Sequence, residues 1–220
     1  MMPPTSIAVK VCGITSLEQA KKIAQLGVNA IGVIGVEKSA RFITEQKRRE
    51  LFSSLEIFAP DLQRVWVVAD QKETSLSKGL SGIGIPSVVQ LHGHESPDLC
   101  SKLKKKHPDT QWWKAIRIKS PTDIKSACSY LGVVDALLLD SWEHGQLGGT
   151  GRRIPLEWLT EENLNQPWWL AGGISAEVIP ELLKQVKPWG IDASSCLETA
   201  PGIKDLKKVR ALVNAINTYI

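Results

Sequence analysis

Short apolar runs recur along the whole chain, separated by segments with the spacing of amphipathic helices. Most of the runs are continuous rather than alternating, as in "IAVKV", "RVWVVAD" and "ALLLD". Continuous runs of this length are typical of parallel strands that are buried on both faces. Eight runs fit this description, and they begin near Ile7, Ala30, Arg64, Val88, Trp112, Ala136, Trp168 and Gly190.

The intervening segments carry signals for the start and end of helices. Thr15 or Ser16 can cap the helix in "TSLEQAKKIAQLG", and Gly27 stands where that helix is expected to stop. Thr44 and Ser96 precede two further segments, the second of which has proline at its first helical position. The same pattern returns in "SPTDIKSACSYLG", "SAEVIPELLKQV" and "IKDLKKVRALVNAI". We therefore expect a helix after each strand.

Eight strand and helix units in alternation predict a (β/α)8 TIM barrel of the α/β class. An open, doubly wound sheet would usually stop at five or six strands. No linker rich in glycine, proline or serine divides the chain, so a single domain over residues 1–220 is predicted. In such a barrel the chemistry belongs at the C-terminal ends of the strands.

The tryptophan pairs 112–113 and 168–169 lie on predicted strands. Neighbours on a strand point to opposite faces, so one ring of each pair should face the barrel interior and the other the helices. We interpret these rings as core rather than as a platform for stacking bases.

Composition and charge narrow the class of protein. Hydrophobic residues make up 43% and charged residues 23%, the balance of a soluble globular protein. The net charge of +4 comes from 27 basic and 23 acidic residues, too even a mixture to indicate nucleic-acid binding. The basic run "KLKKKH" fits the solvated face of a helix.

No apolar run is long enough for a membrane span, and the start "MMPPTS" has no features of a leader. A cytoplasmic protein is predicted. The four cysteines, Cys12, Cys100, Cys128 and Cys196, are far apart, with spacing that suits neither zinc nor a disulfide framework. Reduced thiols and no metal are expected.

Two ionisable residues end predicted strands. Cys12 is either a small buried side chain or a thiolate that acts as a nucleophile or a base, and Lys10 shares its strand face. Asp140 closes the apolar run "ALLLD", where partial desolvation would favour its protonated form and suit it to donating a proton. The alternative for Asp140 is a structural aspartate that caps a backbone turn.

Arg41 and two histidines follow other strands. The planar guanidinium of Arg41 suits a substrate carboxylate, although a solvated loop arginine is equally compatible with the sequence. His92 and His94 alternate around Gly93, but no third ligand has a matching spacing, which disfavours a metal site.

Glycine-rich and serine-rich turns follow the last three strands. They are "GGTG" at 148–151, "AGG" at 171–173 and "ASS" at 193–195. Phosphate is often held by backbone N–H groups of such turns after strands seven and eight of a barrel. A helix-capping turn is the alternative for "AGG" alone. The residues of interest are Gly149, Gly172, Gly173, Ser194 and Ser195.

Taken together, these motifs resemble the phosphoribosylanthranilate isomerase family over nearly the whole chain. The resemblance rests on "VKVCGIT", "KSARFIT", "VVQLHG", "LLLD" followed by "GGTGR", "LAGGI" and "DASSCLETAPGIKD". It implies a (β/α)8 barrel enzyme of tryptophan biosynthesis, an intramolecular aldose–ketose isomerase with neither metal nor organic cofactor. The implied reaction is the Amadori rearrangement of N-(5-phosphoribosyl)anthranilate to 1-(2-carboxyphenylamino)-1-deoxyribulose 5-phosphate.

The resemblance also implies roles for individual residues. Cys12 corresponds to the general base, Asp140 to the general acid and Arg41 to the residue that holds the anthranilate carboxylate. Gln90 and His92, from "VVQLHG", become candidate substrate-binding residues, and the turns of the last three strands would hold the ribose phosphate. The implied partner is a small phosphoribosyl substrate, not nucleic acid or membrane, and the state is a monomer or homodimer.

The chain departs from the family pattern in two places. "GVIGVEKSA" lacks the aromatic residues often found on strand two, and Cys196 replaces the glycine common after the two serines. A side chain there could crowd the phosphate loop or require a different backbone geometry. The alternative functions are another sugar-phosphate isomerase or epimerase, or a non-catalytic barrel that binds a phosphorylated ligand.

Overall fold

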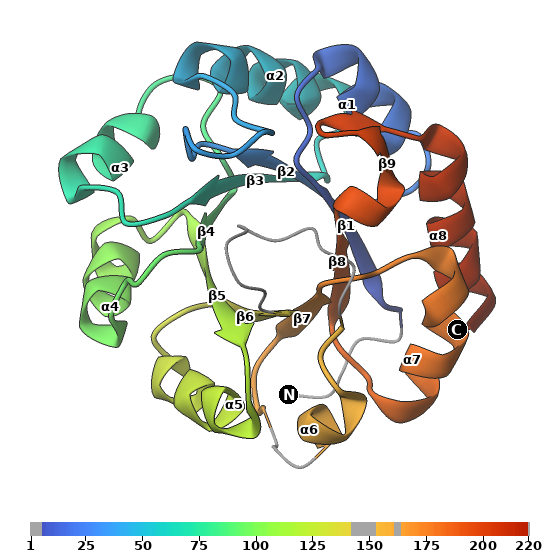
Figure 1. Cartoon of the computed structure of the whole chain (residues 1–220). Coiled ribbons are helices and arrows are strands. Elements are labelled where there is room, and N and C mark those ends of the chain that lie inside the picture. Colours follow the sequence, from blue (N-terminus) through green and yellow to red (C-terminus); the bar gives the residue numbers. More distant parts are fainter. Residues whose placement is uncertain (1–5, 142–152, 161–163, 220) are drawn as a thin grey trace.

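The computed structural model describes residues 6–141, 153–160 and 164–219, and within them eight parallel strands form a closed barrel (Figure 1). Each strand pairs with its neighbours in the sequence, and β1 pairs with β8 to close the ring. This confirms the predicted fold class. The strands are β1 (Ala8–Cys12), β2 (Ala30–Ile34), β3 (Gln63–Val68), β4 (Val88–Leu91), β5 (Gln111–Ile118), β6 (Ala136–Ser141), β7 (Trp168–Ala171) and β8 (Gly190–Ala193).

Helices surround the barrel, and the side chains of Ser16, Thr44 and Ser96 cap three of them by accepting backbone N–H groups, as predicted. They are α1 (Leu17–Ala24), α2 (Glu45–Phe58), α3 (Glu73–Gly79), α4 (Pro97–Lys106), α5 (Pro121–Ala127), α6 (Leu156–Thr160), α7 (Ile179–Gln185) and α8 (Leu206–Tyr219). Short 3-10 helices add η1 (Cys128–Tyr130), η2 (Ala176–Val178) and η3 (Ser195–Leu197).

The last two helices differ in detail from the sequence pattern. The segment expected to form one helix from Ala176 begins as η2, and α7 starts only at Ile179 with a proline in its first turn. After β8 the chain forms η3 and a small antiparallel hairpin, β9 (Glu198–Ala200) and β10 (Ile203–Lys204), before α8. This hairpin lies at the end of the barrel that carries the strand C-termini, above β1 and β8 in Figure 1.

The barrel interior is filled by alternate residues of the strands. Trp113 and Trp169 point inward, and their rings stack with centroids 4.7 Å apart, whereas Trp112 and Trp168 pack against the helices. This confirms the orientation predicted for the tryptophan pairs. Smaller inward side chains, such as Ala30 on β2, leave room on the other side of the barrel. The bulky rings therefore fill the part of the interior near the N-terminal ends of the strands. Polar inward residues lie nearer the C-terminal ends.

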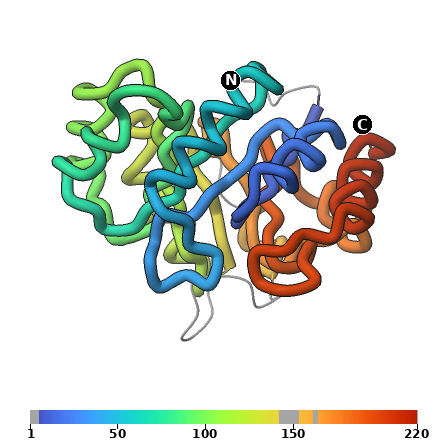
Figure 2. Tube along the Cα trace, turned by 90° about the horizontal axis from the view of Figure 1, so that it is seen from above, coloured from blue at the N-terminus to red at the C-terminus, as the bar shows by residue number. Residues whose placement is uncertain are grey.

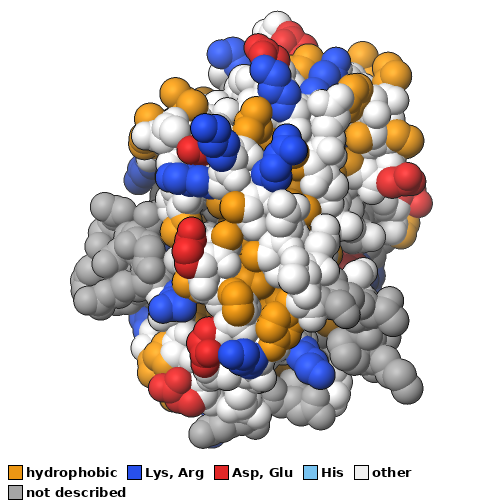
Figure 3. Space-filling view, turned by 90° about the vertical axis from the view of Figure 1, so that its right-hand side faces the viewer, with side chains coloured by type: hydrophobic (Ala, Val, Ile, Leu, Met, Phe, Trp, Pro, Cys, Tyr) orange, Lys and Arg blue, Asp and Glu red, His pale blue; other side chains and the backbone are white. Residues whose placement is uncertain are grey.

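The two ends of the described chain meet at one seam of the ring. Residues of β1 and β8 lie in register, with Lys10 opposite Asp192, and α8 packs beside α1 (Figure 2). The face that α7 and α8 cover carries basic and acidic side chains interspersed with scattered apolar ones (Figure 3). Within the described ranges, no helix is long and apolar enough to cross a membrane.

A buried ion pair outside the barrel wall fixes the loop that follows β4. Lys114, on the outer face of β5, donates to Glu95 at 2.8 Å and to the carbonyl of Gly93 at 2.7 Å. Glu95 also accepts the backbone N–H of Asp70, which joins this loop to the loop after β3. Both charged side chains of the pair are 2% exposed. Water therefore cannot replace either partner.

We predict that Glu95→Ala lowers the free energy of unfolding by about 3 to 5 kcal/mol, because it leaves the Lys114 ammonium buried without a counter-charge. Urea denaturation followed by circular dichroism would measure the loss. The matched control is Glu73→Ala, which removes a pair with the well-exposed Lys102 and should cost far less stability than Glu95→Ala. Equal losses in the two variants would contradict the role given to burial.

Candidate active site

A pocket at the C-terminal mouth of the barrel is lined by residues from all eight strands or the loops directly after them. Each candidate of the sequence analysis within the described residues lies in its lining. These are Cys12, Arg41, Gln90, His92, Asp140, Gly172, Gly173, Ser194 and Ser195. Gly149, the remaining candidate, lies outside the described residues. One pocket thus brings together a thiol, a carboxylate, a guanidinium and two glycine-rich or serine-rich turns.

Cys12 ends β1 with its side chain inside the barrel and only 7% of its surface exposed. Gly32, its register partner on β2, makes room for it. A Cβ atom at Gly32 would lie 2.7 Å from Cys12 Sγ and 3.2 Å from Lys10 Cε. The absence of a side chain at this position therefore allows the thiol and the lysine to share one face of the seam.

The charges around Cys12 determine its affinity for a proton. Burial raises the pKa of the Cys12 thiol above its usual value, while the ammonium groups of Lys10 and Lys204 act in the opposite direction. Lys10 is fully buried, yet its pKa is raised, because attraction to Asp192 and Cys12 outweighs the cost of desolvation. Lys10 therefore stays protonated beside the thiol and favours the thiolate.

Asp140, at the end of β6, belongs to a short polar chain across the mouth. Its Oδ2 lies 3.5 Å from His92 Nε2, and His92 Nδ1 lies 3.2 Å from the amide nitrogen of Gln90. Arg117, on the inward face of β5, donates to the backbone carbonyl of His92 at 3.1 Å. With 9% of its surface exposed, Asp140 is accessible only from the pocket.

Arg41 is held in place by the hairpin after β8. Its Nε and Nη2 donate to both carboxylate oxygens of Glu198 at 2.7 to 3.1 Å, and this pairing raises the pKa of Arg41. Lys204 donates to the same carboxylate at 2.6 Å and to the carbonyl of Ser194 at 3.1 Å. Arg41 is thus neither a freely solvated loop arginine nor a cation without a partner.

The turns after β7 and β8 have the backbone expected of an anion-binding rim. Gly172 and Gly173 both have positive φ, 91° and 63°, and a Cβ at Gly172 would lie 2.0 Å from Ser141 Oγ. The Oγ of Ser194 donates to the carbonyl of Cys12 at 3.0 Å. The side chain of Ser194 therefore joins the two loops, which leaves its backbone and Ser195 to face the pocket.

Cys196 lies in the 3-10 turn η3 and lines the pocket. Among the described residues that are not glycine, only Asp70 has positive φ, so the cysteine is accommodated without backbone strain. His94 is largely exposed and pairs with Asp70 at 3.1 Å. Across residues 6–141, 153–160 and 164–219, no group of three or more histidine, cysteine, aspartate or glutamate side chains is arranged to hold a metal ion.

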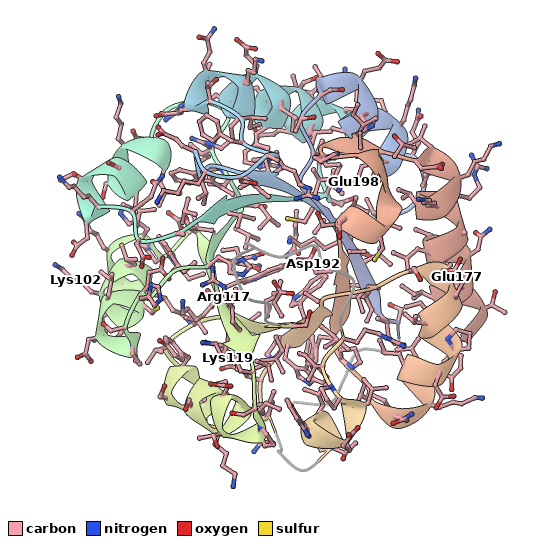
Figure 4. The ribbon with its side chains drawn as sticks, viewed as in Figure 1. Lys102, Arg117, Lys119, Glu177, Asp192 and Glu198 are labelled. Atoms are coloured by element: carbon pink, nitrogen blue, oxygen red, sulfur yellow. The ribbon has the colours of Figure 1, made fainter. Side chains whose placement is uncertain are left out.

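Two charged residues of the pocket were not among the candidates predicted from the sequence. Arg117 lies two residues beyond Ala115 on the inward face of β5, and Asp192 lies two residues before Ser194 on β8. Figure 4 labels both near the centre of the barrel, and Glu198 further out beside the hairpin. The alternation of side chains along a strand could have identified both, because it places Arg117 and Asp192 on the face that points into the barrel.

Comparison with known proteins identifies the family. Residues 9–215 match the family model of N-(5'-phosphoribosyl)anthranilate (PRA) isomerase. Relatives named N-(5'-phosphoribosyl)anthranilate isomerase include one from Nostoc punctiforme, 40% identical over 96% of this chain and 98% of its own length. Another, from Thermosynechococcus vestitus, is 39% identical over 96% of this chain and 90% of its own.

Solved structures agree with the sequence relatives. Phosphoribosyl anthranilate isomerase from Thermotoga maritima superimposes with a TM-score of 0.86 at 26% identity, covering 96% of this chain and 99% of that one. A second structure, with a TM-score of 0.80 and 26% identity over 96% of this chain and 99% of its own, is a phosphoribosyl anthranilate isomerase in complex with reduced 1-(o-carboxyphenylamino)-1-deoxyribulose 5-phosphate. The family match and these relatives, which span almost the entire chain, show that this barrel belongs to the N-(5'-phosphoribosyl)anthranilate isomerase family.

Proposed function

We propose that this chain performs the isomerisation of its family, in the pathway to tryptophan, with Cys12 as general base and Asp140 as general acid. The observation that supports this most directly is that both groups line one pocket, from the ends of β1 and β6. An acid and a base that reach one substrate from different strands suit a proton-transfer reaction, and the family reaction changes no oxidation state overall.

The proposed reaction begins at Asp140. Its proton passes to the ring oxygen of the furanose in N-(5-phosphoribosyl)anthranilate, and the bond from that oxygen to the first sugar carbon breaks, which gives an iminium ion. The Cys12 thiolate then removes the proton from the second sugar carbon, and the electron pair forms an enolamine. Tautomerisation moves the hydroxyl proton to the first carbon, which leaves the ketone 1-(2-carboxyphenylamino)-1-deoxyribulose 5-phosphate.

The two anionic ends of the substrate suit different parts of the rim. Arg41 remains the candidate for the anthranilate carboxylate, because Glu198 occupies Nε and Nη2 and so leaves the Nη1 edge of the planar guanidinium for a second carboxylate. The backbone of Gly172 and Gly173, with Ser194 and Ser195, would hold the phosphate. Gln90 and His92 line the wall between these positions and would contact the sugar.

We further propose that residues 1–220 work as a single barrel domain in the cytoplasm, as a monomer or homodimer. A solved relative from Thermotoga maritima is described as mutually generated monomers of a dimeric enzyme, so both states are compatible with this fold. The partner is the small phosphoribosyl substrate. Neither nucleic acid nor membrane has a role in this proposal, and the mechanism uses no cofactor.

We predict that Cys12→Ser and Asp140→Asn each lower kcat by at least about 100-fold, because each removes one group that moves a proton. Fluorescence-monitored turnover of freshly generated N-(5-phosphoribosyl)anthranilate would measure this. The matched controls are Cys128→Ser and Asp135→Asn, which change the same residue types outside the pocket. A native protein that binds a phosphorylated ligand but does not isomerise the substrate would instead favour the non-catalytic barrel.

The raised pKa of Cys12 predicts how the reactivity of its thiol depends on pH. Because burial keeps the thiol protonated in neutral solution, the thiolate fraction should increase about tenfold per pH unit from about pH 6 to about pH 8, and the rate at which iodoacetamide alkylates Cys12 should rise with it. Lys10→Met removes a charge that favours the thiolate, so the rise should move to higher pH. A flat alkylation rate over this range would contradict a raised thiol pKa.

Arg41→Lys tests the carboxylate site. A lysine is a point charge without the planar fork, so it can hold Glu198 and a second carboxylate only with fewer and less directional hydrogen bonds. We expect KM to increase about tenfold or more with a smaller change in kcat, measured in the same fluorescence assay. Arg49→Lys, on α2 outside the pocket, is the control and should leave KM unchanged. An unchanged KM in Arg41→Lys would exclude Arg41 as the carboxylate-binding residue.

A further inference from the structure

Arg117 is a cation of the pocket that has no carboxylate partner among the described residues. Its side chain is on the inward face of β5, partly exposed, and forms part of the pocket lining (Figure 4). Nη2 donates to the carbonyl of His92 at 3.1 Å, which directs the guanidinium toward β4. Asp140, the register partner of Arg117 on β6, lies against the His92 ring instead. The positive charge of Arg117 is therefore not neutralised within the described structure.

Two nitrogens of this guanidinium are open to a ligand. Nε and Nη1 have no hydrogen-bond partner in the described parts of the chain, and neither nitrogen is buried. Because Arg117 points into the barrel, the surface that these atoms expose faces the pocket. Carboxylates and phosphates are the groups that a planar guanidinium with free N–H groups binds best. An open arginine at this place is therefore suited to an anionic group of a ligand.

The other arginine of the pocket is already engaged. Glu198 accepts from Nε and Nη2 of Arg41, which leaves the Nη1 edge for a substrate. Glu198, which also pairs with Lys204, opposes the charge of Arg41 at 2.7 Å. An arginine without such a partner attracts a substrate anion more strongly. Arg117 is thus the pocket arginine whose charge is available in full to a ligand.

The substrate of the proposed function, on which this inference rests, has two anionic ends, and the topology of the ring favours one of them for Arg117. The turns proposed for the phosphate follow β7 and β8. The strand that carries Arg117, β5, pairs with β4 and β6, so neither strand of the phosphate rim adjoins it. When the phosphate lies at those turns, the five-carbon chain of the ribose carries the anthranilate away from them. The carboxylate is therefore the end that comes within reach of β5.

We propose that Arg117 is a second carboxylate-binding residue of the pocket. Its open N–H groups donate to the anthranilate carboxylate from β5, while Arg41 donates from the loop after β2. A carboxylate has two oxygens with about four lone-pair sites, so it can accept from both arginines. Arg117 is then a specificity-determining residue that selects an aryl carboxylate, separate from the acid and the base.

Three stable probes separate the two anionic ends. The first, 2-[(2,3,4-trihydroxy-5-phosphonooxypentyl)amino]benzoate, carries both. The second, 5-anilino-2,3,4-trihydroxypentyl phosphate, lacks only the carboxylate, and the third, 2-[(2,3,4,5-tetrahydroxypentyl)amino]benzoate, lacks only the phosphate. Isothermal titration calorimetry would give Kd for each probe with the native protein and with Arg117→Gln. The glutamine amide is neutral but retains an N–H donor for the carbonyl of His92, so the substitution removes chiefly the charge.

We expect Arg117→Gln to raise Kd about tenfold or more for the two probes that carry the carboxylate, and less than about twofold for the probe without it. Arg210→Gln, at an exposed position on α8 outside the pocket, is the matched control and should change none of the three values. Equal weakening of all three probes, or three unchanged Kd values, would overturn the inference. Weakening confined to the two phosphorylated probes would overturn it as well, because Arg117 would then bind the phosphate.

A second variant decides the question if Arg117→Gln does not fold. Arg117→Met keeps an unbranched apolar stem in the barrel but has neither charge nor donor, and the same selective rise in Kd is expected. A rise that does not depend on the carboxylate of the probe would again overturn the inference. Failure of the proposed function looks different, because the native protein would then neither bind the first probe nor isomerise N-(5-phosphoribosyl)anthranilate.

Discussion

The candidate site depends on the buried ion pair between Lys10 and Asp192. An ammonium inside a barrel has no water to solvate it, so it needs a carboxylate at hydrogen-bond distance, and Asp192 provides one at 2.8 Å. The two residues are register partners on β1 and β8, so the pair lies across the seam where the chain closes into a ring. The same ammonium lies beside Cys12, so the contact across the closing seam also places a positive charge next to the proposed base.

A second group of charges fixes the rim in the same way. Glu198 accepts hydrogen bonds from Arg41 and Lys204, and Lys204 donates to the carbonyl of Ser194. Ser194 in turn donates to the carbonyl of Cys12, so the loops after β1, β2 and β8 form one connected network. A cation held by two carboxylate oxygens loses little further freedom when a substrate binds, which favours catalysis by preorganisation.

Much of the fold could be predicted from the sequence, because strand and helix patterns are local. The predicted strand starts differ from the observed ones by at most one residue. Because Cys12 and Asp140 end the first and sixth predicted strands, the sequence also placed both at the C-terminal mouth of the barrel. The charge network could not be predicted, since its partners are remote in the chain. Lys10 and Asp192 are separated by 182 positions, and Arg41 and Glu198 by 157. Only the closed ring brings such residues together, which is why the sequence did not indicate Glu198 as the partner of Arg41.

The raised pKa of Cys12 fits the task proposed for it. Removing a proton from carbon requires a strong base, and a thiolate in an apolar setting is a stronger base than one in water. Burial alone would leave almost no thiolate near neutral pH, so Lys10 and Lys204 must offset part of its effect. Asp192 limits how far they do so, because its own charge favours the protonated thiol. The Lys10–Asp192 pair therefore keeps the pKa of the Cys12 thiol between two extremes. A lower pKa would make the thiolate too weak a base, and a higher one would leave too little thiolate.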